Sequence, residues 1–186
     1  VCFELDGEAE QLGLAVELET HALRKACRLL GGLPEGTTLS LNVSPRTVLD
    51  GLPDTLGEDL DWSRLVFELT EHVPVEDYEA LQTALDRLRE RGARLAIDDA
   101  GAGFASLRHI VNLTPDIIKL DIGITRGVDS DPSRSAIAEM VTRFAERVDI
   151  RVIAEGVETP EERDTLIALG LTLGQGYLFG RPTIAG

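Results

Sequence analysis

Polar residues occur at the end of every strand-like segment of this chain, and their types suit a hard metal ion. They are Asn42, Glu68, Glu71, Asp98, Asp99, Lys119, Glu155 and Gln175. Three of their types are rare here, because the chain has two Lys, two Asn and three Gln. Carboxylate and amide oxygens suit Mg²⁺ or Mn²⁺, whereas zinc prefers Cys and His. A pair of such ions activates water and stabilises the leaving oxygen in phosphate-ester hydrolysis.

The elements that must position these side chains alternate between strands and helices. Apolar spacing predicts strands at 39–43, 64–70, 94–97, 116–120 and 151–154, and a short strand toward 174–179. Helices are predicted at 15–30, 75–91, 104–112, 133–147 and 160–169. This alternation predicts an α/β fold with parallel strands. A doubly wound sheet and a (β/α) barrel both fit, and polar residues at the strand ends favour the barrel, whose strands all end at one rim.

Each polar residue, taken alone, also has an ordinary explanation. An acidic residue after a strand often caps a helix, as Asp98 and Asp99 would before the turn at 101–103. Lys119 would then pair with Asp121 or Glu155 and merely hold the strand ends together. This explanation does not account for a polar residue at the end of every strand.

Composition limits the partners and the cellular compartment. With 33 acidic and 18 basic residues the 186-residue chain has a formal charge of −15, which argues against binding of duplex nucleic acid or an anionic membrane. Cys2 and Cys27 cannot form a disulfide framework or a structural zinc site. No apolar run reaches the roughly 18 residues that a membrane span needs, and no signal peptide opens the chain. We therefore expect a cytoplasmic protein with one domain over residues 1–186.

Six motifs of the sequence resemble, in order, those of EAL domains, which are bacterial phosphodiesterases of cyclic di-GMP. They are Asn-Val-Ser-Pro at 42–45, Glu-Leu-Thr-Glu at 68–71, Asp-Asp-Ala-Gly-Ala-Gly-Phe-Ala-Ser-Leu at 98–107, Asp-Ile-Ile-Lys-Leu-Asp at 116–121, Ala-Glu-Gly-Val-Glu-Thr at 154–159 and Gln-Gly-Tyr at 175–177. The resemblance runs from about Leu12 to Pro182, nearly the whole chain.

The resemblance implies a TIM-like barrel with one irregular strand and a rim that holds two Mg²⁺ or Mn²⁺ ions. By motif match, Asn42 and Glu68 would bind the first ion. Asp98 would bridge both ions, and Asp99 and Glu155 would hold the second. The reaction would open one phosphodiester of cyclic di-GMP and give linear pGpG.

The resemblance also assigns roles to three further residues. Lys119 would position or help deprotonate the attacking water, and Gln175 would lie near the metals and the substrate. Glu71 would anchor the loop at 99–106, which in this family is tied to metal binding and dimerisation. We therefore expect a homodimer.

The sequence departs from the family pattern in two places. The Glu-Ala-Leu motif of the first barrel strand, which supplies a ligand to the first metal, is absent, so the barrel is incomplete at its N-terminus. Ala100 and Ala102 replace the aromatic and hydroxyl residues that are common in the loop. Two function classes follow: an active hydrolase whose first strand precedes Val1, or an inactive domain that acts as a cyclic di-GMP receptor or as a protein-interaction scaffold. We expect a longer chain with sensory or diguanylate-cyclase domains.

Overall fold

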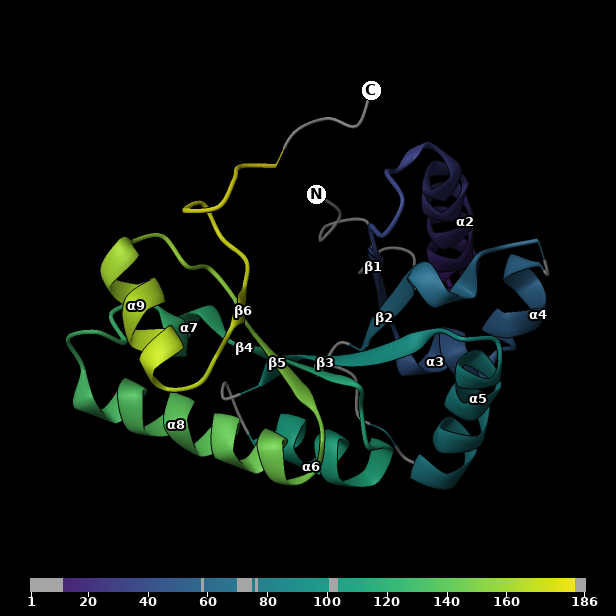
Figure 1. The fold of residues 1–186 in the computed structure, drawn as a ribbon. Coiled ribbons are helices and arrows are strands. Elements are labelled where there is room, and N and C mark those ends of the chain that lie inside the picture. Colours follow the sequence, from purple (N-terminus) through teal and green to yellow (C-terminus); the bar gives the residue numbers. More distant parts are fainter. Residues whose placement is uncertain (1–11, 58, 70–74, 76, 101–103, 183–186) are drawn as a thin grey trace. The chain divides into compact units, whose positions relative to one another are not determined.

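The computed structural model describes residues 12–57, 59–69, 75, 77–100 and 104–182, with the backbone alone for Asp99 and residues 104–107 (Figure 1). The chain divides into two compact units, residues 1–95 and 96–186. Both units follow the predicted α/β pattern, in which parallel strands alternate with helices.

The first unit contains two parallel strands and four α-helices in its described residues. In chain order its elements are α2 (Ala15–Cys27), a 3₁₀ helix (Arg28–Gly32), β1 (Leu39–Val43), α3 (Pro45–Leu49), α4 (Leu52–Leu56), a second 3₁₀ helix (Trp62–Arg64), β2 (Leu65–Leu69) and α5 (Tyr78–Glu90). In the β1–β2 pair Asn42 lies opposite Glu68. The core includes all of β2 and the α5 stripe of Leu81, Leu85 and Leu88. Their burial follows from the apolar spacing that predicts these elements.

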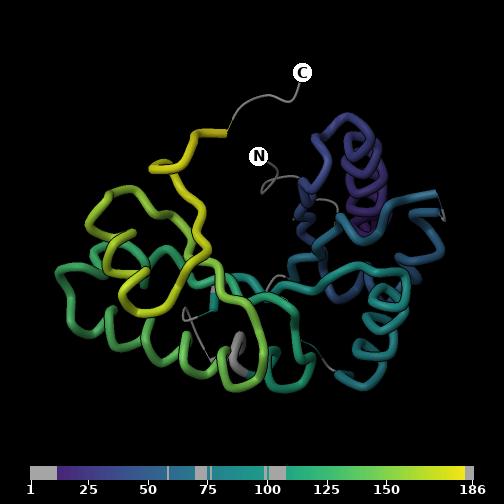
Figure 2. Tube along the Cα trace, in the orientation of Figure 1, coloured from purple at the N-terminus to yellow at the C-terminus, as the bar shows by residue number. Residues whose placement is uncertain are grey.

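The second unit contains most of β3, whose first two residues belong to the first unit, and three further parallel strands in its described residues, and Figure 2 allows the chain to be followed through them. Its elements are β3 (Arg94–Ala100), α6 (Phe104–Leu113), β4 (Ile117–Leu120), α7 (Ile122–Thr125), α8 (Pro132–Arg147), β5 (Arg151–Ala154), α9 (Pro160–Ala168) and β6 (Leu173–Gly174). β4 pairs with β3 and β5, and β6 pairs with β5. Every residue of β4 is buried, so the charged Lys119 stands in an otherwise apolar strand.

The observed elements confirm most of the predicted ones, and the differences have local causes. β1 and β5 have the predicted bounds, whereas α2 ends at Cys27 because the chain tightens into a 3₁₀ helix. The short helices α3, α4 and α7 were not predicted, because four or five residues show no helical periodicity. β3 continues beyond Ile97 to Ala100, so the prediction that this strand ends at Ile97 was wrong. The pair Asp98-Asp99 disfavours a strand by propensity, which explains the error.

A separate feature concerns membrane insertion. Among the residues that the structure describes, none of the helices combines the length and the apolar character needed to span a bilayer.

Candidate active site

Lys119 is a buried cation between two carboxylates of the second unit. Its Nζ lies 2.9 Å from Oδ1 of Asp98 and 2.8 Å from Oε1 of Glu155. The Lys119 side chain is 7% exposed and the two carboxylates are 19% and 15% exposed, so water screens these charges little. We call Asp98, Lys119, Glu155 and Gln175 the lysine cluster.

A β-bulge brings Asp98 to Lys119. Ile97 pairs with Ile118 and Ala100 pairs with Leu120, so Asp98 and Asp99 together lie opposite the single residue Lys119. In a regular strand adjacent side chains face opposite sides, and a bulge relaxes this alternation and redirects a side chain. The bulge therefore explains how a residue beyond the predicted end of the strand contacts the buried lysine.

Glu155 and Gln175 occupy the same level of the second unit's strands. The strand residues that pair across this level are Ala100, Leu120, Ala154 and Gly174. The Glu155 N–H donates to the Leu120 carbonyl at 3.1 Å, and the Gln175 N–H donates to the Ala154 carbonyl at 2.8 Å. Nε2 of Gln175 donates to Oε1 of Glu155. Residues far apart in sequence thus meet because parallel strands end together.

The charge of Glu155 depends on its neighbours. Burial raises the pKa of Glu155 to about 7, while the Lys119 ammonium opposes this rise and the Asp98 carboxylate adds to it. A buried carboxyl that ionises with difficulty gains from a further cation close to it. The electrostatics of the cluster are therefore compatible with a bound metal ion.

Two glycines allow the loop after Glu155 to pack closely. Gly156 has φ +66°, and a Cβ there would lie 2.3 Å from Cγ1 of Ile122. Gly176 has φ +153°, and a Cβ there would lie 2.2 Å from the carbonyl oxygen of Val157. The Val157 N–H also donates to the Gln175 carbonyl at 3.0 Å. Any larger side chain would push this loop, and with it Glu155, out of place.

Asn42 and Glu68 form the second group of site residues, which we call the amide–carboxylate pair. They are register partners on β1 and β2, and adjacent strands lie about 4.8 Å apart. Leu41 and Val43 are buried, Asn42 between them is exposed, and Glu68 is 8% exposed. The pair presents an amide oxygen beside a carboxylate, both of which are ligands for a hard cation.

The side chains of two predicted site residues, Glu71 and Asp99, are not among those that the structure describes. Glu71 lies outside the described residues, and of Asp99 the backbone alone is described. Within the described residues, no group of three or more His, Cys, Asp or Glu side chains is arranged to hold a metal ion. The described donors form two oxygen-only sets that suit Mg²⁺ or Mn²⁺ by type, and the two-ion centre stays a prediction.

Sequence reasoning also missed two carboxylates, Glu162 and Glu19, that bind backbone N–H groups of neighbouring segments. Glu162 accepts hydrogen bonds from the N–H groups of Gly127 at 3.0 Å, Glu158 at 2.9 Å and Thr159 at 3.1 Å. The spacing of Thr159 and Glu162 is that of a capping box, a signal that could have revealed this role. Glu19 contacts Ser44 across 25 residues, and no sequence pattern predicts that contact.

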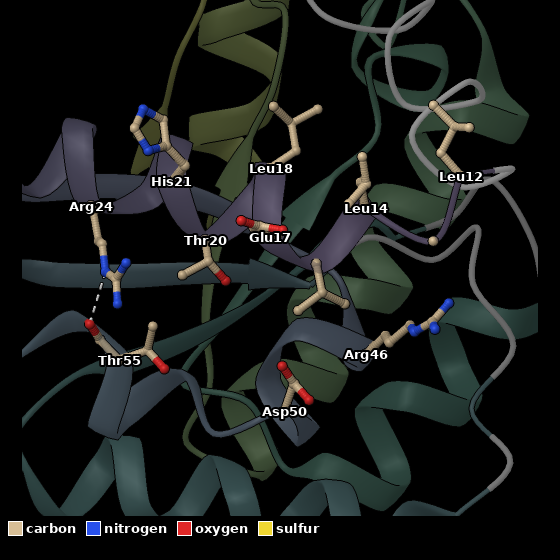
Figure 3. A pocket seen from close by; sticks show the side chains of 12 residues that line it. Leu12, Leu14, Glu17, Leu18, Thr20, His21, Arg24, Arg46, Asp50 and Thr55 are labelled. Carbon is tan, nitrogen blue, oxygen red and sulfur yellow. Dashed lines mark hydrogen bonds between the residues drawn. The ribbon is translucent and has the colours of Figure 1, made fainter.

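A groove of about 960 Å³ lies in the first unit beside α2 (Figure 3). Arg24 and Arg46 line it together with Glu17 and Asp50, so both signs of charge face the groove. None of the predicted site residues is among the described residues that line it. Its mixed lining does not indicate a particular ligand.

Comparison with known proteins assigns this combination of strands and polar residues to a family. Residues 4–182 match the EAL domain. The chain belongs to the EAL domain family. This EAL domain is 33% identical over 186 residues to the probable cyclic di-GMP phosphodiesterase PdeG of Escherichia coli, a match covering 94% of the chain and 36% of PdeG. The chain spans about a third of the length of the curated relatives that it matches first.

Solved EAL structures have the same fold. The phosphodiesterase PaMucR in complex with c-di-GMP matches 100% of the chain with a TM-score of 0.86 and 29% identity, and 85% of its own chain is covered. The manganese/cyclic di-GMP complex of Klebsiella pneumoniae BlrP1 matches 90% of the chain with a TM-score of 0.80 and 34% identity, covering 45% of BlrP1. The predicted fold class, an α/β fold of the TIM-like EAL type, is thereby confirmed.

Proposed function

We propose that this EAL domain hydrolyses one phosphodiester bond of cyclic di-GMP to linear pGpG, with two Mg²⁺ or Mn²⁺ ions as cofactors. Relatives named as cyclic di-GMP phosphodiesterases and the manganese complex of BlrP1 support this proposal. The observation that carries it is the buried Lys119 between Asp98 and Glu155. This cluster provides a fixed cation and two oxygen ligands at the strand ends, where phosphodiester chemistry needs them.

The proposed ligands come from both groups of site residues. Asn42 and Glu68 would hold the first ion, Asp98 both ions, and Asp99 and Glu155 the second. Their oxygen donors suit Mg²⁺ and Mn²⁺. When bound, the ions supply activation of water and stabilisation of the leaving oxygen.

The chain's own residues contribute charge and position. The Lys119 ammonium fixes the two carboxylates and stabilises negative charge that develops on the phosphoryl oxygens. It also positions the attacking water or helps to remove its proton. Gln175 holds Glu155 through its hydrogen bond, and it would lie beside the substrate. Glu71, which lies outside the described residues, would anchor the loop at 99–106.

The test is product analysis with the chain and any residues that precede Val1 in the natural protein. Incubation with cyclic di-GMP and Mn²⁺ or Mg²⁺ should give pGpG, and chelation of the metal should stop its formation. A folded protein that binds cyclic di-GMP but forms no pGpG with either ion contradicts the proposal.

A cyclic di-GMP receptor without turnover is the second candidate function. The departures of the loop from the family pattern at Ala100 and Ala102 are the feature that leaves this candidate open. A receptor would bind cyclic di-GMP stoichiometrically in calorimetry and leave it intact. Residues before Val1 that form an apolar strand with Glu-x-Leu would favour the enzyme.

We also propose that the domain forms a homodimer through α8. Met140, Phe144 and Val148 recur every four residues and are 55%, 38% and 44% exposed. Glu139 and Arg143 pair with each other beside this apolar stripe, and a two-fold axis would bring the same stripe of two copies together. Light scattering should show that Phe144→Glu shifts the dimer to monomer, whereas Ile167→Glu on α9 does not. An unchanged dimer in Phe144→Glu contradicts this interface.

We further propose that the domain is one part of a longer chain that also carries sensory or diguanylate-cyclase domains. The chain covers 27% of MucR of Pseudomonas aeruginosa, which is named a bifunctional diguanylate cyclase/cyclic di-GMP phosphodiesterase. The natural sequence on either side of residues 1–186 tests this directly.

A further inference from the structure

Glu19 makes an unusual contact between helix α2 and the end of strand β1. Its Oε1 accepts the N–H of Ser44 at 2.7 Å, and its Oε2 accepts the hydroxyl of Ser44 at 2.7 Å. Oε2 also accepts the hydroxyl of Thr47. Hydrogen bonds to an ionised carboxylate are about twice as strong as neutral ones. One carboxylate thus fixes both the backbone and the side chain of Ser44.

Ser44 is the residue at which β1 turns into α3. It is extended, with φ −80° and ψ 149°, and its hydroxyl accepts the N–H of Thr47 at 3.2 Å as the N-cap of α3. Thr47 and Val48 on α3 are buried, so this short helix is packed against the unit. Glu19 on α2 therefore fixes the turn between β1 and α3 through its hydrogen bonds to Ser44.

Asn42 lies two residues before that turn. Its side chain is exposed and makes no hydrogen bond among the described residues, so its position follows from the backbone of β1. That backbone is held by the ladder to β2, which sets Asn42 opposite Glu68, and by Ser44 at its carboxyl end. A shift at Ser44 would move Asn42 relative to Glu68.

We propose that Glu19 is a positioning residue for Asn42, which it holds through Ser44 in the place required for metal binding beside Glu68. This inference rests on the proposed function, because it takes Asn42 as a metal ligand. Residues that orient metal ligands typically change metal affinity by about 10- to 100-fold when replaced. Glu19→Gln keeps the shape of the side chain, removes its charge and replaces one acceptor oxygen by an N–H donor.

The chain offers a direct readout in the protein with Mn²⁺ alone. Asn42 and Asn112 are its two asparagines, so ¹⁵N-labelled protein gives two asparagine side-chain amide pairs in NMR. Asn112 donates to the Arg108 carbonyl on the exposed side of α6 and serves as internal reference. Paramagnetic Mn²⁺ should broaden the Asn42 pair first in the parent. In Glu19→Gln the same broadening should require a Mn²⁺ concentration at least about tenfold higher than in the parent.

Two variants separate positioning from a general loss of stability. Glu17→Gln removes a carboxylate from the exposed side of the same helix, at the groove shown in Figure 3, and should leave the Mn²⁺ titration unchanged. Ser44→Ala removes the hydroxyl's bond to Glu19 together with its N-cap bond to Thr47, keeps the backbone bond to Glu19, and should also weaken Mn²⁺ binding, with α2 untouched. It gives the test a second route if Glu19→Gln does not fold.

The possible failures are distinguishable. If Mn²⁺ does not broaden the Asn42 pair of the parent before the Asn112 pair, the metal assignment in the proposed function is wrong. If the parent responds as expected but Glu19→Gln or Ser44→Ala titrates like the parent, even with a lower melting temperature, the positioning role of Glu19 is wrong.

Discussion

The lysine cluster and the amide–carboxylate pair are held in place by different forces. In the cluster, Lys119 contacts the carboxylates of Asp98 and Glu155 directly, so the functional groups fix one another. Asn42 of the pair is neutral and exposed, and its side chain has no hydrogen-bond partner in the part of the chain that the structure describes. The position of Asn42 is set by the pairing of β1 with β2 and by Glu19, which acts through its hydrogen bond to Ser44.

This difference illustrates two ways of holding oxygen donors in position. A buried charge cluster orients itself, but burial of its charges is costly, as the pKa of Glu155 near 7 indicates. An exposed amide carries no such cost but depends on the geometry of its strand. Substitutions in the cluster should therefore act first through charge, and substitutions around the pair through position.

The largest expected effect comes from Asp98→Asn, which removes charge from the cluster and keeps its shape. If Asp98 bridges two ions, turnover of cyclic di-GMP to pGpG should fall by at least about 10³-fold, because the amide cannot neutralise both. Asp129→Asn, on an exposed loop of the same unit, is the matched control and should retain parental turnover. A rate for Asp98→Asn within about threefold of the parent contradicts the bridging role.

Lys119→Met tests whether the cation itself contributes to catalysis. With the stem kept and the charge removed, kcat should fall by roughly 10²-fold while cyclic di-GMP binding is largely retained. The chain's other lysine, the exposed Lys25 on α2, provides Lys25→Met as control. A purely structural ion pair predicts instead a lower melting temperature with kcat reduced in proportion to the folded fraction. A folded Lys119→Met protein with kcat close to the parent rules the catalytic role out.

Gly176→Ala tests whether the cluster also depends on backbone packing. The new Cβ would lie 2.2 Å from the Val157 carbonyl oxygen, at φ +153°, so we expect a loss of about 2–3 kcal/mol in the free energy of unfolding. Gly180→Ala is the control, because no described atom lies within 4 Å of its Cβ position. Denaturant unfolding measures both. Equal stability of the two variants shows that the loop after Glu155 tolerates displacement.

The smallest expected effect concerns Glu162 and depends on pH. Burial would raise the pKa of Glu162, but hydrogen bonds from the N–H groups of Glu158, Gly127 and Thr159 outweigh it and lower this pKa below 4.5. Glu162 therefore binds a proton less readily in the folded state than in the unfolded state. Its carboxylate adds to the free energy of unfolding above about pH 5, and this contribution is lost as the pH falls. Glu162→Gln should cost about 1 kcal/mol near neutral pH.

The control for this prediction is Glu161→Gln, because Glu161 is the exposed neighbour. Melting curves of parent and Glu162→Gln should converge as the pH falls below about 4. A difference that is independent of pH means that the carboxylate charge of Glu162 does not contribute to stability.

Much of the fold follows from local sequence alone. Period-2 and period-3.6 apolar spacing placed β1, β5 and α8 within one residue of their observed bounds. The rarity of lysine in the chain drew attention to Lys119, which the structure places buried among the apolar residues of β4. These features need no knowledge of distant residues, because they depend on which side chains lie one strand or one helical turn apart.

The details that make the site depend on contacts that local sequence does not encode. The partners of Lys119 were left open between Asp121 and Glu155, and the structure places Asp98 and Glu155 there, while Asp121 accepts the N–H of Gly123 and caps α7. The bulge at Asp98 arises from pairing with β4, and the contact of Glu19 with Ser44 joins residues 25 positions apart. Register and long-range hydrogen bonds are fixed only when whole strands and helices pack, because their energy depends on both partners at once. The sequence alone therefore indicated which residue types could carry the proposed chemistry, and the tertiary structure decided which of the described ones touch.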